Sequence, residues 1–227
     1  MPRALVLLEL GPVSVEYLIK QKRAGYLHVL LNASEDSISK AVFQQQLDKP
    51  LPGDWASYIK NDLKELDIQM SFEEIGIMSK GKWKSLVRKR AREACFKSLI
   101  KDKAKLSKGK EICYNKLETQ CYFRPGTNLT TETKRRIFKV RSRDLLLKCN
   151  FPGAFDDLKC VTGCDEDSID DQKHLFYCPV LSGNTVMSEN VRYENIFIQN
   201  NVFKQEQVVN IIFDHFQKRN KILSPDC

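Results

Sequence analysis

The chain has 227 residues, of which 42% are hydrophobic and 29% are charged, so it can bury a core and is not disordered throughout. Basic residues outnumber acidic ones by 37 to 29, and the formal net charge is +8. This excess favours a polyanionic partner, either nucleic acid or an anionic membrane face, through the summed field of the charges.

The start of the chain carries no pattern of a membrane span or a secretory signal. Its longest apolar run, Ala4–Leu8, stops at Glu9, whereas a span needs about 20 residues. Without a secretory signal, the eight cysteines are expected as reduced thiols or metal ligands. We therefore expect an intracellular protein of the nucleus or cytoplasm, with no membrane partner.

Residues 1–78 have the pattern of a helical region. Apolar side chains recur at three- and four-residue steps in the first helix, and Ser34 or Asp36 can cap the second. Asp54 can cap a third helix, and Ser71 with Glu74 has the spacing of a capping box that opens a fourth.

Residues 79–150 form a basic helical region. Thirteen basic and two acidic residues between Lys80 and Lys110 give this stretch a local charge of +11. Helical spacing of apolar residues predicts a long helix docked through one face, with a basic opposite face; the predicted stripe is Trp83, Leu86, Val87, Ala91, Ala94, Ser98 and Leu99. Thr130 or Thr131 can cap a second basic helix, whose apolar part extends to Leu147.

These two helices supply the candidate contacts to phosphate groups. Their charge is of one sign, and glutamate–lysine pairs at i,i+4 are nearly absent, so an anionic ligand is favoured over a merely solvated face. No aromatic platform is evident beside them, which predicts RNA or DNA binding with low sequence specificity. The candidates are Lys82, Lys84, Arg88, Lys89, Arg92, Lys134, Arg135 and Arg136.

The strongest local motif lies in residues 151–182 and has the spacing C-x3-C-x9-H-x3-C. Cys160, Cys164, His174 and Cys178 supply two close pairs of thiolate and imidazole ligands, the set that Zn²⁺ binds as a tetrahedron. Gly163 suits the sharp bend of the first pair. The alternative is that these are ordinary cysteines and a surface histidine.

The acidic stretch between the two ligand pairs, residues 165–171, does not match a calcium loop, because its glycine and final glutamate are out of register. We interpret it as a solvated loop. Residues 183–227 read as a linker followed by a C-terminal helix over Gln205–Asn220. The whole pattern predicts a mainly α fold: a helical body with two basic helices and a small zinc-stabilised module.

Catalytic motifs are poorly supported. Asp156 and Asp157 are similar to the aspartate pair that binds magnesium in polymerases, but no apolar strand precedes them, so we interpret them as loop residues. There is no glycine-rich phosphate loop and no nucleophile elbow. His28 and His215 lie within apolar helical patterns and are expected in the core. We predict no enzyme and no small-molecule substrate, and leave the oligomeric state open.

The order of these segments resembles the region that follows the polymerase core in non-LTR retrotransposon reverse transcriptases. The likeness begins with Gly11–Ile19, continues through Gly53-Asp54-Trp55 and Ser71–Ile75, and reaches the basic helix at Leu86–Arg88. In that family a Cys-Cys-His-Cys zinc-knuckle-like module closes the chain, and its His-Leu-x-x-Cys-Pro ending matches His174–Pro179.

The resemblance implies a detached C-terminal portion of such a polyprotein, with the polymerase and endonuclease cores upstream of this chain. In the family this region is thought to bind template RNA or target DNA. Our hypothesis is therefore a non-catalytic nucleic-acid-binding fragment derived from a retrotransposon. The alternatives are a zinc-stabilised protein-interaction module and an unselected remnant of the element.

Overall fold

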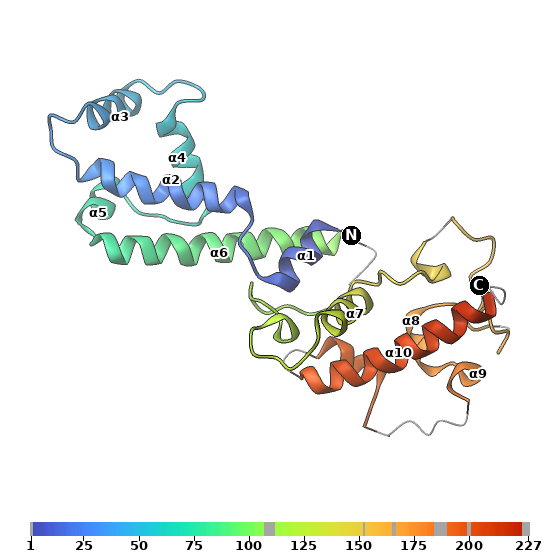
Figure 1. Cartoon of the computed structure of the whole chain (residues 1–227). Helices are drawn as coiled ribbons and strands as arrows, with labels where there is room; N and C mark the ends of the chain where they lie inside the picture. The colour runs from blue at the N-terminus through green and yellow to red at the C-terminus, as the bar shows by residue number, and fades with distance from the viewer. Residues whose placement is uncertain are drawn as a thin grey trace. The chain divides into compact units, whose positions relative to one another are not determined.

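The computed structural model describes residues 2–106, 112–151, 153–164, 167–183, 190–198 and 201–223. Helices make up nearly all the regular structure of these residues, which confirms the mainly α fold (Figure 1). Lys159 and Ile169 form an isolated antiparallel bridge, and no strand occurs in the described ranges. No helix in them is both long and apolar enough to cross a membrane.

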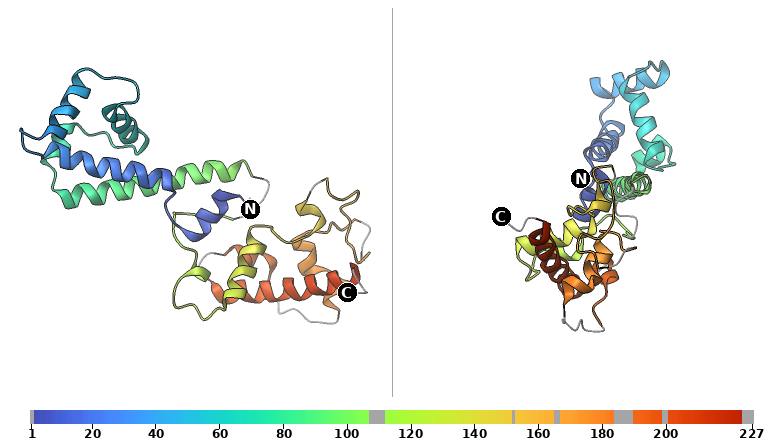
Figure 2. Two further views of the ribbon diagram at one scale, coloured as in Figure 1. Left: turned by 45° about the horizontal axis from the view of Figure 1, so that its top comes forward. Right: turned by 90° about the vertical axis from the view of Figure 1, so that its right-hand side faces the viewer.

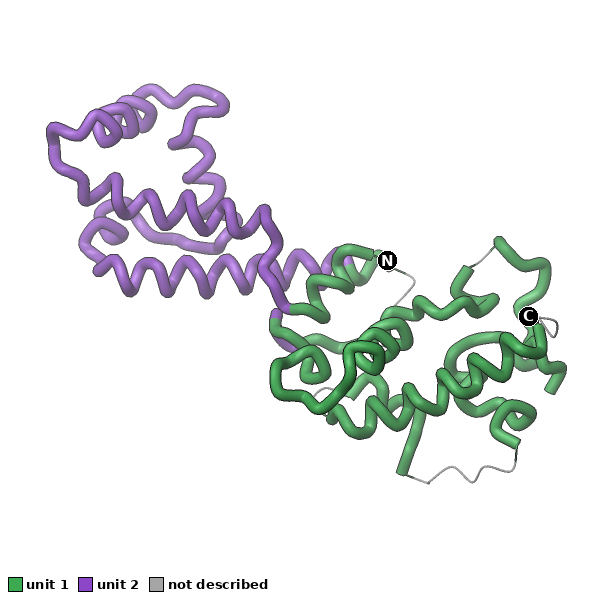
Figure 3. The backbone as a smooth tube through the Cα atoms, in the orientation of Figure 1, with its two compact units in different colours: residues 1–10, 103–114, 118–227 green, residues 11–102, 115–117 purple. Residues whose placement is uncertain are grey.

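The chain divides into two compact units (Figure 3). Unit 2 contains residues 11–102 and 115–117, and unit 1 contains the three remaining stretches, 1–10, 103–114 and 118–227. This division does not follow the four segments expected from the sequence. The basic segment 79–150 is shared, because its long helix belongs to unit 2 and its second helix to unit 1.

Unit 2 is built from five helices of the described chain: α2 (Val15–Leu31), α3 (Ile38–Asp48), α4 (Trp55–Glu65), α5 (Phe72–Ile77) and α6 (Lys80–Ala104). The predicted caps of α4 and α5 are confirmed. Asp54 accepts a hydrogen bond from the amide of Ser57 at 2.6 Å, and Ser71 and Glu74 form a reciprocal capping box. The predicted cap of α3 is wrong: the residue at that position is Ser37.

The long helix α6 packs through one face, as expected, and α2 lies beside it in both views (Figures 1 and 2). The indole N–H of Trp83 donates to the carbonyl oxygen of Ala24 on α2 at 2.8 Å. The predicted stripe is only partly right: Leu86, Ala94 and Ser98 are half-buried, although Leu86 and Ala94 still pack against the core. Steps of four residues continue instead, so the buried face is Trp83, Val87, Ala91, Cys95 and Leu99.

Unit 1 consists of α1 (Arg3–Leu10), α7 (Thr131–Arg141), α8 (Gln172–Tyr177), α9 (Pro179–Ser182) and α10 (Val202–Leu223), with single 3₁₀ turns at Cys121–Phe123, Lys148–Asn150 and Tyr193–Phe197. Thr130 caps α7, as predicted, by accepting from the amide of Thr133 at 3.1 Å. The helix ends earlier than expected, because Arg143 turns the chain with a positive φ of 53°. The apolar residues up to Leu147 therefore lie beyond it.

A buried charged cluster ties α1 into unit 1. The Glu9 carboxylate accepts hydrogen bonds from Arg141 Nε at 3.0 Å and from the hydroxyl groups of Tyr114 and Tyr122. Burial and the negative charge of Glu9 raise the pKa of both tyrosines well above the usual value. Arg141 also donates to the carbonyl oxygen of Ile196 at 2.7 Å, so this single guanidinium links three segments of the unit.

Candidate metal centre

The first two candidate ligands lie on either side of a tight turn. Gly163 has a φ of 63°, a conformation that costs glycine little, and its amide donates to the Cys160 carbonyl at 3.2 Å. The amide of Cys160 in turn donates to Ser168 O at 2.8 Å, next to the bridge between Lys159 and Ile169. The turn is thus held at its base, and both thiols project from it.

The other two ligands come from α8 and its end. Asp171 caps α8 by accepting from the amide of His174 at 2.7 Å. His174 and Cys178 are four residues apart, which places them on the same side of one helical turn. Pro179 starts α9 directly after Cys178 because proline suits the first position of a helix, and this fixes Cys178 at the junction.

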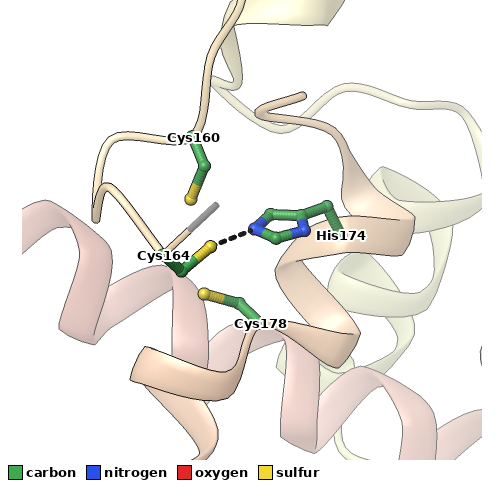
Figure 4. A group of neighbouring side chains, drawn as sticks. All are labelled: Cys160, Cys164, His174 and Cys178. Carbon is green, nitrogen blue, oxygen red and sulfur yellow. Dashed lines mark hydrogen bonds between the residues drawn. The ribbon is translucent and has the colours of Figure 1, made fainter. Parts of the chain in front are cut away.

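The four ligand atoms converge (Figure 4). They all lie within 4.8 Å of one another, and Cys164 Sγ is 3.2 Å from His174 Nε2. A tetrahedral zinc ion, bonded at about 2.0–2.3 Å, separates its ligand atoms by roughly 3.5–4 Å. The cluster therefore has the ligand number and nearly the spacing of a closed metal centre. Within the described residues it is the only group found with such an arrangement.

Burial and hydrogen bonds act differently on the thiols. Burial raises the pKa of Cys164 to about 11, and the neighbouring thiols of Cys160 and Cys178 act in the same direction. Burial also acts to raise the pKa of Cys178, but hydrogen bonds from the Thr162 hydroxyl and the Leu181 amide outweigh it and lower that pKa. A metal ion binds the thiolate forms, so binding must release protons.

Thr162 is a part of the site that the sequence motif did not reveal. Its hydroxyl oxygen lies 3.1 Å from Cys160 Sγ and 3.4 Å from Cys178 Sγ. It can donate to one of these sulfurs at a time, which favours a thiolate there. The only signal in the sequence was a hydroxyl residue between two candidate ligands.

The helix α10 makes hydrogen bonds to the segments that carry the candidate ligands. Arg219 Nε donates to Asp170 at 2.9 Å, and the other oxygen of that carboxylate accepts from the Lys148 amide, also at 2.9 Å. His215 Nδ1 lies 2.8 Å from the carbonyl oxygen of Leu175 on α8. His215 is buried, as predicted from its position.

The predicted solvation of the acidic stretch is wrong for one residue: Asp170 is only 3% exposed. Its pairing with Arg219 explains this, because a buried carboxylate needs a cationic or hydrogen-bonding partner. Asp171 serves as the cap of α8. Asp165 and Glu166 lie outside the described residues. The metal-binding segment and α10 are therefore one packed assembly within unit 1.

The candidate phosphate contacts on α6 divide into two groups. Lys82, Lys84 and Arg88 are exposed, and in the described part of the chain no carboxylate lies within ion-pairing distance of them. Lys89 is also exposed, with its Nζ 4.0 Å from Glu93. Arg92 has a structural role, because its guanidinium donates to the carbonyl oxygens of Gly11 and Leu117.

The candidates on α7 belong to the other unit. Arg135 is exposed and Lys134 is half-buried. Arg136 bonds Glu132 at 3.1 Å, and its guanidinium lies 5.0 Å from the ring centre of Phe213. Arg136 is thus partly engaged within the unit, as Arg92 is within its own.

The aspartate pair behaves as a loop element. Asp157 accepts hydrogen bonds from Lys148 Nζ at 2.6 Å and from the Lys159 amide at 2.9 Å, and these bonds lower the pKa of Asp157. His28 is buried, as predicted, with Nε2 2.7 Å from the carbonyl oxygen of Met78.

Comparison of the chain with protein families, curated proteins and solved structures found no match.

Proposed function

We propose that the cluster binds Zn²⁺ and that the chain is a non-catalytic module that binds RNA or DNA. Three thiols and one imidazole form the borderline-soft set that suits tetrahedral zinc. All four positions around the ion are filled by the protein, which leaves no ligand position for a substrate and is typical of structural zinc. The centre would hold the turn at Cys160–Cys164 against α8.

The nucleic-acid part of the proposal rests on one observation, the three exposed cations near the start of α6 that have no carboxylate partner in the described residues. Lys82, Lys84 and Arg88 are solvent-exposed on a helix whose opposite face is buried. Lys84 and Arg88, four residues apart, share one face and repel each other, and phosphate groups relieve that repulsion while releasing counterions. Three such contacts predict a slope of log K against log salt of about −2.7 on duplex DNA and about −2.1 on single strands.

We propose an origin that agrees with this function: a C-terminal portion of a non-LTR retrotransposon reverse transcriptase. The resemblance of the segment order and of His174–Pro179 supports this origin. Such a portion would bind template RNA or target DNA without catalysing polymerisation itself.

Binding of the full chain to labelled RNA and to duplex DNA across a salt series tests the proposal. The variant Lys82→Ala/Lys84→Ala/Arg88→Ala should lose most of the affinity and make the slope shallower by about 2.7 on duplex DNA. A matched control removes three exposed lysines elsewhere in unit 2 and should leave the slope unchanged; it is Lys22→Ala/Lys49→Ala/Lys60→Ala. No binding at ~50 mM salt, or equal losses in both variants, would refute the proposal.

A second candidate function, protein interaction, is favoured by an apolar hollow in unit 2. The hollow has a volume of about 260 Å³ and is lined by Tyr26, Leu30, Ile38, Ser39, Val42, Phe43, Gln46 and Trp55. Ile38 is 81% exposed and Val42 is 46% exposed, so part of this apolar lining meets solvent. A protein bound there should resist competition by nucleic acid and should be released by Val42→Asp.

A further inference from the structure

Unit 1 also contains a hollow. It lies next to the candidate metal centre, and none of the candidate ligands lines it. Its volume is about 500 Å³, within the range of small-molecule sites. It is lined by residues from the loops around Phe155 and Leu146, from the turn of the metal centre, and from the last turn of α10. The lining residues are Leu146, Lys148, Phe155, Val161, Arg219, Asn220, Lys221 and Leu223.

The hollow combines exposed apolar side chains with positive charge. Leu146, Phe155 and Leu223 are 61%, 40% and 52% exposed, so large apolar groups meet solvent on several sides of it. Lys148, Arg219 and Lys221 carry the only formal charges among the lining residues. The ligand that fits such a lining has a flat apolar part and an anionic group.

The partners of the three cations indicate where an anion would bind. Arg219 is paired with Asp170, and Lys148 with Asp157. Lys221, by contrast, is exposed and has no carboxylate within ion-pairing distance in the described ranges. Lys221 is therefore the cation available to a phosphate group.

The loop that carries Phe155 is fixed by hydrogen bonds at Asp157. Asp157, two residues after Phe155, bonds both the Lys148 side chain and the amide of Lys159. Asn220 accepts a bond from Arg219 Nη1 at 3.2 Å, which leaves the amide N–H groups of Asn220 free to donate to a base edge.

We propose that this hollow binds an unpaired nucleobase of a single-stranded nucleic acid. The base stacks on Phe155, and the adjoining phosphate pairs with Lys221. Bases in a duplex are stacked on one another and cannot enter, so the hollow distinguishes single strands from duplexes. This inference rests on the proposed nucleic-acid function and assigns it a preferred strand state.

The test uses the full zinc-loaded chain and fluorescence anisotropy with two probes. One is a single-stranded oligonucleotide of about 12 nucleotides, and the other is the blunt-ended duplex of that strand with its complement, in which every base is paired. Phe155→Ala should weaken binding of the single strand by about 5- to 150-fold, the range for loss of one base–aromatic stack, and leave duplex binding unchanged. Phe155→Tyr keeps an aromatic ring and should bind like the unaltered chain.

A matched control is Phe203→Ala, which removes a phenylalanine that is 67% exposed on α10 and does not line the hollow. It should bind both probes normally. Zinc content and melting temperature must stay unchanged in each variant, and photo-crosslinking of a bromouracil-containing strand gives a readout that does not depend on affinity. The crosslink should fall on the peptide that contains Phe155.

The outcomes separate this inference from the proposed function. If Phe155→Ala weakens both probes equally, or neither, or if the crosslink falls only on α6, the base-binding hollow is refuted while nucleic-acid binding stands. If the unaltered chain binds neither probe at ~50 mM salt, the proposed function itself is refuted.

Discussion

Removal of zinc is expected to disrupt unit 1 and to leave unit 2 folded. Cys160 and Cys178 belong to the buried core of unit 1 and pack with Leu175 and Phe176 of α8. In the described residues of unit 2 there is no comparable group of ligands. A metal ion bound to this cluster would therefore act on the stability of unit 1 only.

The size of the expected destabilisation depends on which other interactions stabilise the turn at Cys160–Cys164. Apart from the ligands, its base is fixed by the bridge at Lys159 and by the backbone hydrogen bonds of Cys160 and Asp170. Net contributions of such bonds are about 1 kcal/mol each. Structural zinc contributes about 10–16 kcal/mol of apparent binding free energy, comparable with the entire stability of a domain. Chelation should thus unfold the turn, α8 and the packing of both against α10.

Hydrogen exchange measured by mass spectrometry locates the effect. A zinc chelator should raise exchange in residues 158–183 and in α10, and should leave α2 and α6 protected. Cys164→Ser should reproduce the change, whereas the control Cys149→Ser, which removes another half-buried thiol of unit 1, should not. Unchanged exchange after verified metal removal, or equal effects of the two serine variants, would refute the reasoning.

Further predictions concern the buried polar groups. Glu9→Ala leaves the buried guanidinium of Arg141 unpaired and should cost unit 1 about 3–5 kcal/mol in urea unfolding; Glu9→Leu combined with Arg141→Met should recover most of it. Because burial raises the pKa of Tyr114, its folded form stays protonated while the unfolded form ionises near pH 10. The contribution of Tyr114 to the free energy of unfolding should therefore be complete below pH ~10 and decrease above it by about 1.4 kcal/mol per pH unit. Tyr114→Phe should remove this part of the pH dependence. Trp83→Phe removes the hydrogen bond to the carbonyl of Ala24 and should destabilise unit 2 by about 1 kcal/mol, measured by the same unfolding assay, with no change in metal content.

Features encoded within a few residues were predictable from the sequence. The capping box at Ser71 and Glu74, the cap at Asp54 and the candidate ligand set all depend on local spacing. The buried stripe of α6 was predicted at Trp83, Val87, Ala91 and Leu99 but not at Cys95, because two continuations of a helical face, by three or by four residues, look equally good until the partner helix is known.

Features that depend on distant residues were not predictable. No residue close to Glu9 in the sequence indicates that Arg141 and two tyrosines surround it, because these hydrogen bonds join residues more than 100 positions apart. The burial of Asp170 likewise needs Arg219 from another helix. The charges of such residues can be read from the sequence, but their partners cannot. The acidic stretch 165–171 could therefore be interpreted only as a solvated loop.

Contacts with distant residues also determine which basic side chains can bind a ligand. Arg92, Arg136 and Arg141 count toward the basic character of the chain, yet each uses its guanidinium for contacts inside its own unit. Lys82 and Lys84 make no such contact in the described structure. Arginine presents a planar fork that can bond several carbonyl or carboxylate oxygens at once, whereas lysine carries a compact charge on a flexible stem. The charge available to a ligand is therefore smaller than the count of basic residues suggests, and the three-residue variant of α6 tests one part of it.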